Sequence, residues 1–350
     1  MAMAEIEVFG AGIFGLTVAY CLQKRGAKVR VIEKRRVGAG ASGGVVGALA
    51  PHSPDNWNDK KQFQFESLIA TKAFWAEVDG ISGIASGYGQ TGRLVALLDQ
   101  RELDLARERV ASAKTVWQGH AEWRVVPSGW TQNWGPDSPT GFFSFDTLSA
   151  RISPRAACAS LAAAFLRNGG EILEGQTVGQ GADAAVLCTG YEGLMEMSAG
   201  PDGPVGKGIK GQGLLVDFVA SDLPQIYAAG LHFIPHADGT LAIGSTSEKA
   251  WDDSSGTDAN LEALYRRAIA EFPQLSTAKV LNCWAGVRPC GSRRAPVLGR
   301  HPRLENTFVA NGGFKIGFGV VVKAGQVMAD LVLSGQASIP KGFSVEANFG

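Results

Sequence analysis

The chain opens with a pattern of apolar and polar positions that predicts a strand, a helix and a second strand in close succession. An apolar run at 6–9 leads directly into the sequence GAGIFG at 10–15, and apolar residues then recur at helical spacing. After Gly26, a second apolar run covers 29–32 and ends on Glu33. A dinucleotide-binding βαβ unit requires its elements in this order.

Each glycine of the GAGIFG motif has a physical role in such a unit. Gly10 permits a tight turn, Gly12 lets backbone amides approach a pyrophosphate, and Gly15 lets helix and strand pack closely. The positive end of the helix then faces the phosphates. Glu33 lies near the expected offset of about 20 residues and is able to accept hydrogen bonds from a ribose diol.

The rest of the chain alternates between helical and extended patterns. Aromatic residues are dense between 117 and 147, and this density favours an irregular core over a nucleic-acid stacking platform because no lysines interleave. A turn at Asp238-Gly239 predicts a hairpin. The pattern predicts helices at 63–78, 101–116, 154–167 and 260–272, and strands at 93–98, 171–178, 184–187, 205–219, 232–235, 240–243 and 280–286.

Two further glycine-rich segments bear on the cofactor. The loop at 38–44, with Gly47 beyond it, is open to interpretation as a flexible linker or as a second phosphate-binding loop; its place directly after the ribose-binding strand favours the second. Near the end of the chain, a strand at 307–310, a glycine turn and a helix at 316–333 repeat the opening arrangement. The sequence therefore predicts an α/β fold, α+β overall, with a Rossmann-like domain built from discontinuous segments.

Composition narrows the class of protein. The 350 residues are 45% hydrophobic and 19% charged, with a formal net charge of zero, which argues against a surface built to neutralise phosphates. The five cysteines contain no CxxC pair, so we expect free thiols and neither a disulfide framework nor a zinc or other metal site. The N-terminal pattern and the interrupted apolar stretches predict no signal peptide and no membrane span, so we expect a cytoplasmic protein.

Taken together, these motifs resemble the D-amino acid oxidase, glycine oxidase and sarcosine oxidase superfamily of FAD-dependent amine oxidoreductases. The resemblance covers essentially the whole chain. It rests on four landmarks in order, namely Gly10–Gly15 with Glu33-Lys34-Arg35, Gly40-Ala41-Ser42-Gly43 leading to Gly47, Gly286-Val287-Arg288-Pro289 with Pro296-Val297-Leu298-Gly299, and Gly312-Gly313-Phe314-Lys315-Ile316-Gly317.

The resemblance implies an FAD-binding domain at 1–85, 150–207 and 286–350. A mostly antiparallel substrate domain at 86–149 and 208–285 would cover the flavin ring. Sarcosine oxidases attach their flavin through a cysteine, but Cys290 is not in register with it, so the implied FAD is noncovalent. By the same resemblance, the residues expected at the cofactor are Gly10, Gly12, Ile13, Phe14, Gly15, Glu33, Lys34, Arg35, Ala41, Ser42, Gly43, Gly47, Val178, Thr189, Gly190, Gly313, Phe314, Lys315 and Ile316.

Four residues are candidates for contact with substrate. The family uses the arginine of its GxRP segment to hold a substrate carboxylate, which implies this role for Arg288; a structural salt bridge is the alternative. Lys315 would be a second cation at the carboxylate, or else a surface lysine. His232 falls where relatives place a polar or aromatic side chain over the flavin, and His52 lies where the chain leaves the cofactor loop; either histidine is open to a simple packing role.

The implied reaction is oxidation of the C–N bond of an amino acid or N-substituted glycine. Hydride transfer to flavin N5 gives an imine, which water hydrolyses. Oxygen, reduced to hydrogen peroxide, is the default acceptor among these relatives, and a quinone or protein acceptor would make the enzyme a dehydrogenase. The sequence leaves stereochemistry, substrate size and oligomeric state open.

Three other functions are alternatives to this reaction: modification of tRNA, non-catalytic binding of FAD, and NAD-dependent dehydrogenation. The loop 40–51 also resembles the FAD domain of an enzyme that trims carboxymethylaminomethyl-uridine in tRNA, and basic residues at 293, 294, 300 and 303 would suit a phosphate backbone. Zero net charge and the absence of a fused methyltransferase favour a small molecule over tRNA. A non-catalytic FAD-fold protein remains open, whereas an NAD dehydrogenase gives no role to the Ser42 loop.

Overall fold

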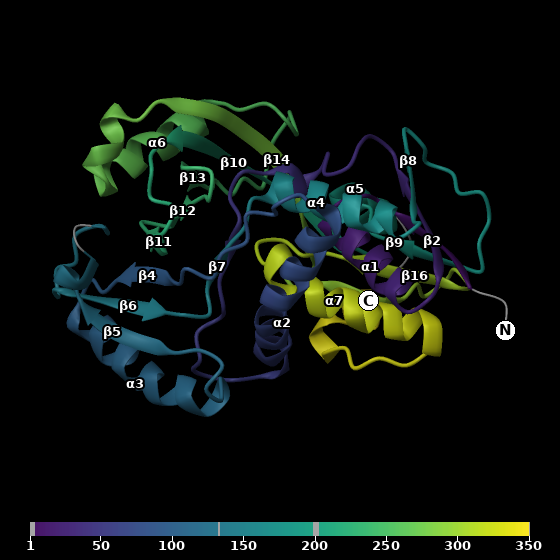
Figure 1. Ribbon diagram of the computed structural model, residues 1–350, viewed down its shortest axis with the longest axis horizontal. Coiled ribbons are helices and arrows are strands. Elements are labelled where there is room, and N and C mark those ends of the chain that lie inside the picture. Colours follow the sequence, from purple (N-terminus) through teal and green to yellow (C-terminus); the bar gives the residue numbers. More distant parts are fainter. Residues whose placement is uncertain (1–3, 132–133, 199–202, 350) are drawn as a thin grey trace.

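The computed structural model describes residues 4–131, 134–198 and 203–349. Two large sheets divide the molecule, with the first strands and most of the long helices on the right of Figure 1 and the second sheet on the left. Both sheets are assembled from segments far apart in sequence. The yellow C-terminal helix lies beside the purple N-terminal one, so the two ends of the chain build the same region (Figure 1).

The first sheet has six strands in the order β15-β16-β9-β1-β2-β8. All neighbours are parallel except β15 and β16. Since β1 has β2 on one side and β9 on the other, the strand order diverges at its carboxyl end, where ligands of open α/β sheets bind. The strands are β1 (Glu5–Phe9), β2 (Lys28–Glu33), β8 (Glu171–Glu174), β9 (Ala184–Leu187), β15 (Val297–Arg300) and β16 (Thr307–Asn311).

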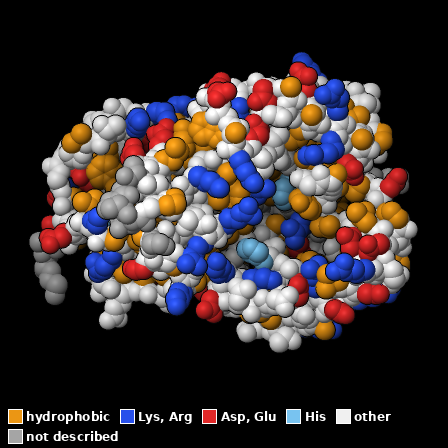
Figure 2. All heavy atoms as spheres, turned by 180° about the vertical axis from the view of Figure 1, so that it is seen from behind, with side chains coloured by type: hydrophobic (Ala, Val, Ile, Leu, Met, Phe, Trp, Pro, Cys, Tyr) orange, Lys and Arg blue, Asp and Glu red, His pale blue; other side chains and the backbone are white. Residues whose placement is uncertain are grey.

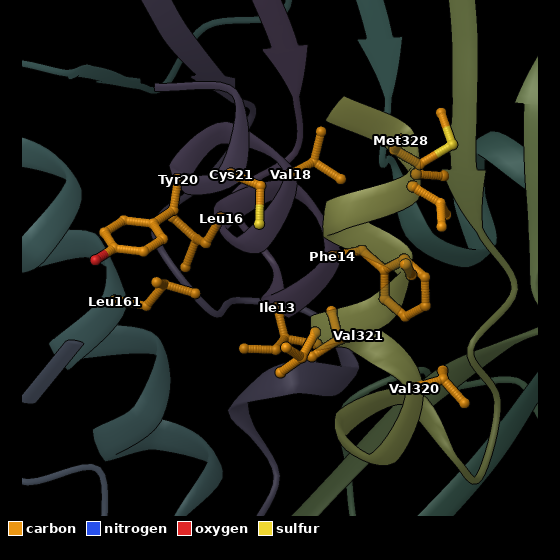
Figure 3. Packing of buried hydrophobic residues seen from close by; sticks show 14 of the residues in the cluster. Ile13, Phe14, Leu16, Val18, Tyr20, Cys21, Leu161, Val320, Val321 and Met328 are labelled. Carbon is orange, nitrogen blue, oxygen red and sulfur yellow. The ribbon is translucent and has the colours of Figure 1, made fainter. Parts of the chain in front are cut away.

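Helices cover this sheet and form the main core with it. Figure 3 shows Ile13 and Phe14 of α1 pointing toward Val321 of α7. The two helices approach closely at Gly325, where a Cβ atom would lie 2.7 Å from the Thr17 side chain. The helices of this region are α1 (Ile13–Lys24), α2 (Asp59–Ser82), α4 (Pro154–Arg167), α5 (Gly190–Ser198), α7 (Gly317–Ser334) and α8 (Val345–Asn348).

By length and composition alone, α7 is apolar enough to cross a membrane. It packs against α1 and α2, and residues such as Val321, Val322 and Met328 are buried inside the protein. Its apolar character therefore follows from its place in the core, while Lys323 and Asp330 lie on the side that reaches the surface.

The second sheet has eight strands in the order β14-β10-β13-β12-β11-β4-β6-β5, antiparallel except for β11 with β4. Two helices, α3 (Gln100–Val116) and α6 (Ala259–Glu271), pack against it. A small two-stranded sheet, β3 (Ala48–Leu49) with β7 (Ala150–Arg151), stands apart. The strands of the large sheet are β4 (Arg93–Ala96), β5 (Trp123–Pro127), β6 (Phe142–Asp146), β10 (Gly206–Asp217), β11 (Gln225–Ala228), β12 (Leu231–Pro235), β13 (Thr240–Gly244) and β14 (Val280–Gly291).

The register of this sheet aligns one residue from every strand in a single transverse row. Because directly paired residues project to the same face, the side chains of this row share one surface. We call it the transverse row; in strand order it consists of Val125, Ser144, Val95, Tyr227, His232, Gly244, Gly213 and Trp284.

The predicted elements are present, and their boundaries moved for identifiable reasons. The helix α2 begins at Asp59 rather than 63, because the Asn58 side chain caps it by accepting from Lys60 N and Lys61 N. The strand β14 continues to Gly291 rather than stopping at 286, because it pairs with β10 along its length. The predicted domain boundary at 286 thus falls inside a strand, and the division into two domains stays a prediction.

Candidate active site

A cavity opens at the carboxyl end of β1 and the first turn of α1. Its lining comes from the glycine turn, the end of β2, the 40–42 loop and the start of α5. The residues predicted at the cofactor that line it are Gly10, Gly12, Ile13, Phe14, Glu33, Lys34, Arg35, Ala41, Ser42, Thr189 and Gly190.

Glu33 is held rigidly at the edge of this cavity. Its carboxylate accepts hydrogen bonds from Ala11 N and Arg35 N, both at 2.7 Å, and the side chain is buried. Each carboxylate oxygen retains a further lone pair for an incoming hydroxyl. The geometry is that of an acceptor for the two hydroxyls of a ribose.

The N-terminus of α1 and the 40–42 loop form the phosphate-sized part of the cavity. Ser42 Oγ accepts from Ile13 N at 2.9 Å, which fixes the loop against the helix. The amides of Gly12 and Phe14 have no hydrogen bond to another described residue outside helices. Free amides at the positive end of a helix are suited to bind an anion.

Gly15, Gly43 and Gly47 do not line the cavity but allow close packing of the backbone around it. A Cβ on Gly15 would lie 1.8 Å from the Gly10 carbonyl oxygen, as expected for the glycine that lets helix and strand approach. Gly43 and Gly47 do not line the cavity; their Cβ atoms would meet the carbonyl oxygens of Gly38 at 2.3 Å and Ile152 at 1.8 Å. These two glycines therefore let the loop pack closely against the backbone on the side away from the cavity.

Val178 is not placed as expected. Its side chain is 76% exposed, and the residues before it, Gln176 and Thr177, line the cavity instead. Lys34 and Arg35 both face Glu192 of α5, with Nζ to Oε2 at 3.4 Å and NH1 to Oε1 at 2.7 Å. An ion-paired wall therefore closes the outer side of the cavity.

A second cavity continues from the first, and both are lined by Ile13, Phe14, Ala41, Ser42 and Pro289. Its walls are the 313–318 turn and the face of the eight-stranded sheet that carries the transverse row. An extended ligand is thus able to lie along both cavities without a break.

Arg288 lies in the wall of the second cavity and is only 9% exposed. Its guanidinium lies across Gly211, where a Cβ would come within 1.9 Å of NH2. NH1 donates to Thr246 O at 3.2 Å and NH2 to Ser245 Oγ at 2.6 Å. Burial lowers the pKa of Arg288 to about 10, and the charge of Glu248 opposes this shift.

The closing glycine turn brings Gly313, Phe314 and Lys315 to the same cavity, whereas Ile316 lines a smaller hollow next to it. Phe314 N donates to Pro289 O and Ile316 N to Gly313 O, each at 2.9 Å. These two amides are therefore engaged within the protein. Burial, with the charges of Arg288 and Arg294, lowers the pKa of Lys315.

The two candidate histidines, His232 and His52, lie in different places. His232 lines the second cavity and its Nδ1 is a buried atom without a hydrogen-bond partner. Burial lowers the pKa of His232 to about 3, and the charges of Arg93, Lys315 and Arg288 act in the same direction. His52 lines only the smaller hollow and its backbone N and ring Nδ1 both contact Gln64 Oε1.

Three residues of this cavity were missed by sequence reasoning. Trp284 and Tyr227 belong to the transverse row, and Ser245 follows β13 and holds Arg288. The period of two along β14, which puts Trp284 on the same face as Arg288, was the one available clue for Trp284. Nothing local marks Tyr227 or Ser245.

The model of one protein family, described as FAD dependent oxidoreductase, matches residues 5–331. The chain belongs to this family. The family expected from the sequence motifs is thereby confirmed, as are the fold class and FAD as cofactor.

The chain is similar to several named relatives. It is 26% identical to the glycine oxidase of Bacillus licheniformis over 93% of this chain and 92% of that protein. The crystal structure of glycine oxidase from Geobacillus kaustophilus aligns with a TM-score of 0.85 at 21% identity, covering 99% of this chain and 100% of the other. Iminodiacetate oxidase from Chelativorans sp. aligns with a TM-score of 0.83 at 20% identity, covering 97% and 98%.

The two cavities fit FAD. Free amides and the Ser42 loop would hold the pyrophosphate, and Glu33 would accept hydrogen bonds from the ribose. The second cavity, between the 313–317 turn and the transverse row, would hold the flavin ring. Among the described residues, no group of three or more His, Cys, Asp or Glu side chains is arranged to hold a metal ion.

Proposed function

We propose that the protein oxidises the C–N bond of an amino acid or N-substituted glycine. One observation carries the proposal. Arg288 is a buried cation, aimed into the cavity that continues from the FAD site, and it forms no ion pair with any residue in the described parts of the chain. A buried charge without a partner is costly, and a substrate carboxylate supplies the missing one.

Arg288 binds and orients the substrate in this proposal. Of its five N–H donors, the bonds to Ser245 and Thr246 use two, so the guanidinium is fixed while the others remain for two parallel bonds to a carboxylate. Lys315 adds a second positive charge at the other side of the cavity. The carboxylate is thereby held at a defined place beside the flavin.

His232 acts as a neutral group. Since burial lowers its pKa to about 3, its ring is uncharged in neutral solution and adds no third positive charge to the cavity that Arg288 and Lys315 line. Trp284 and Phe314 add apolar walls that exclude water. When bound, FAD supplies the electron acceptor, taking the α-hydrogen with its electron pair at N5 and leaving an imine that water hydrolyses.

Reoxidation of FAD by oxygen, with release of hydrogen peroxide, completes the proposed reaction. The names of the similar proteins, glycine oxidase and iminodiacetate oxidase, support a small carboxylated amine as substrate. Noncovalent FAD is supported by Cys290, which is buried on β14 and does not line either cavity. A cavity-bound small molecule is favoured over tRNA, and a cytoplasmic location stays a prediction.

Anaerobic reduction of the flavin tests this function. The purified yellow protein is mixed without oxygen with glycine, sarcosine, D- and L-amino acids and N-alkylglycines, and the flavin absorbance is followed. Bleaching by at least one carboxylated amine, and peroxide on admission of air, are the expected results. A flavin that no such amine bleaches would refute the proposal, and bleaching without peroxide would indicate a dehydrogenase.

A further inference from the structure

A third cavity lies beyond the proposed substrate site, and we call it the distal cavity. It is lined by β4, the inner face of α3 and the turn between β11 and β12. The reaction proposed above makes no use of it. Tyr227 and Gly230 line both this cavity and the one that holds Arg288, so the two spaces meet there.

The transverse row forms a continuous floor from one space to the other. Trp284 and His232 lie in the substrate cavity, Tyr227 lies at the junction, and Val95 and Ser144 lie in the distal cavity. The rings of Tyr227 and His232 are 4.8 Å apart. A substituent that leaves the substrate nitrogen above His232 therefore follows the row past Tyr227 toward Val95.

The distance suits a short chain. Val95 lies two strands from His232, and neighbouring strands are ~4.8 Å apart, so the step is about 10 Å. An extended substituent of six atoms spans roughly 7 Å at the rise per bond of an extended chain. Such a chain passes the junction and ends inside the distal cavity.

The walls of the distal cavity are apolar near the floor. Val95, Leu97, Leu105 and Ala228 supply aliphatic surface, with the Trp123 ring behind them. A methylene chain gains free energy from each CH₂ that it buries here. The floor and walls therefore select an aliphatic chain rather than a polar one.

The charges of the distal cavity are opposite in sign to those of the substrate cavity. Its two arginines are neutralised, Arg93 by Asp146 at 3.2 Å and Arg109 by Asp55 at 2.8 Å. Its acids Glu102, Asp137 and Glu271 form no ion pair within the residues that the structure describes. The far end of the ligand path is therefore negative, whereas Arg288 and Lys315 make the near end positive.

We propose that the distal cavity binds the far end of the substrate, and that this end is an aliphatic chain that terminates in a cationic group. The preferred substrate is then a carboxylated secondary amine or long amino acid with a second, positively charged nitrogen about six atoms from the oxidised one. This inference rests on the proposed function, since it identifies the class of substrate for the same site.

Four achiral substrates test it on the FAD-loaded protein: sarcosine, N-hexylglycine, N-(5-aminopentyl)glycine and N-(5-carboxypentyl)glycine. The hexyl and aminopentyl substituents contain the same number of heavy atoms, so they differ only in charge. We expect kcat/KM for both to exceed that for sarcosine by at least about tenfold. The aminopentyl compound should exceed the carboxypentyl one by about tenfold.

Variants of residues that line the distal cavity test whether the preference for long substituents arises there. Val95→Phe fills the floor of the distal cavity and should lower the ratio of kcat/KM for N-hexylglycine to that for sarcosine by about fivefold or more. If Val95→Phe does not retain FAD, Leu105→Phe gives the same measurement from the opposite wall. Glu271→Gln should reduce the preference for the cationic end about threefold. The matched control Glu108→Gln, which changes an exposed acid of α3 outside the cavity, should keep the wild-type ratios.

The outcomes separate the two proposals. Bleaching of the flavin by sarcosine, with no gain from any longer substituent, would refute the distal site and leave the proposed reaction intact. Equal efficiency for the amino and carboxy ends would refute the charge preference. If none of the four compounds bleaches the flavin but a short amino acid does, the distal site alone is refuted. If no amino acid and no N-substituted glycine bleaches it, the proposed function itself fails.

Discussion

The cavity that receives the nucleotide and the cavity that receives the substrate share a wall, yet the chain builds them in different ways. The first takes its glycine turn, its free amides and the Glu33 carboxylate from the 10–42 segment. The second takes Tyr227, His232 and Trp284 from a row that strand pairing across the eight-stranded sheet brings together. A cofactor common to many enzymes requires a fixed backbone, whereas a particular substrate is recognised by exchangeable side chains.

This contrast is tested most strongly by Arg288→Ala. The variant removes a buried guanidinium from the substrate cavity only, so kcat/KM for the true substrate should fall by at least ~10–100-fold while FAD stays bound. Steady-state kinetics and the absorbance ratio of flavin to protein measure the two effects. Arg288→Lys is the matched control, and it should recover only part of the activity because it restores the charge but not the two parallel bonds. Unchanged kinetics would remove Arg288 from the site.

Gly313→Ala probes the wall that the two cavities share. A Cβ at this position would lie 2.5 Å from the Phe14 ring, so the variant should lose about 1–3 kcal/mol of unfolding free energy by overpacking. Thermal or chemical denaturation measures the loss. In the double variant with Phe14→Leu, the combined loss should be smaller than the sum of the two single losses. Strict additivity would show that the two residues do not oppose each other.

Glu33→Ala addresses the nucleotide cavity alone. Loss of the carboxylate should weaken FAD binding about tenfold while KM of the FAD-saturated enzyme is unchanged. Titration of the apoprotein with FAD gives the dissociation constant. Glu192→Ala, which removes the half-exposed ion pairs with Lys34 and Arg35, should have a much smaller effect. A changed substrate preference in Glu33→Ala would contradict the separation of roles.

The smallest expected effect is a rise of KM at alkaline pH, caused by loss of the positive charge of Lys315. Its pKa is lowered by burial and by the charges of Arg288 and Arg294, so as pH rises its charge is lost earlier than that of a free lysine. KM should therefore rise about threefold at a lower pH than that at which a free lysine loses its charge. In Lys315→Met, KM should start at the higher value and lack that first rise. If KM rises with pH in the same way in the wild type and in Lys315→Met, the rise is caused by another titrating group.

Much of the fold was predictable because its signals are local. The GAGIFG turn, Glu33 and Ser42 lie within one βαβ unit and the loop that follows it, and the structure places them together as their types require. Arg288 and Lys315 were found through motifs, although what makes Arg288 informative, its burial without an acid, is visible only in the fold.

Tyr227, Trp284 and the distal cavity could not be predicted. Their proximity depends on the pairings of β14 with β10 and of β11 with β4, which join strands far apart in sequence, and a shift of one residue in either pairing would turn a side chain to the other face. Val178 was misplaced for a related reason, because the short strand β8 ends at Glu174 and the loop beyond it presents Gln176 and Thr177 instead.

The strand order of the six-stranded sheet also bears on how the chain folds during synthesis. The strand β9 lies between β1 and β16, but β16, at residues 307–311, is made long after both. Until then one edge of β9 has no partner, and the apolar face of α1 that packs on α7 is uncovered. The nucleotide cavity is therefore completed long after its glycine motif has left the ribosome, when β16 and α7 follow.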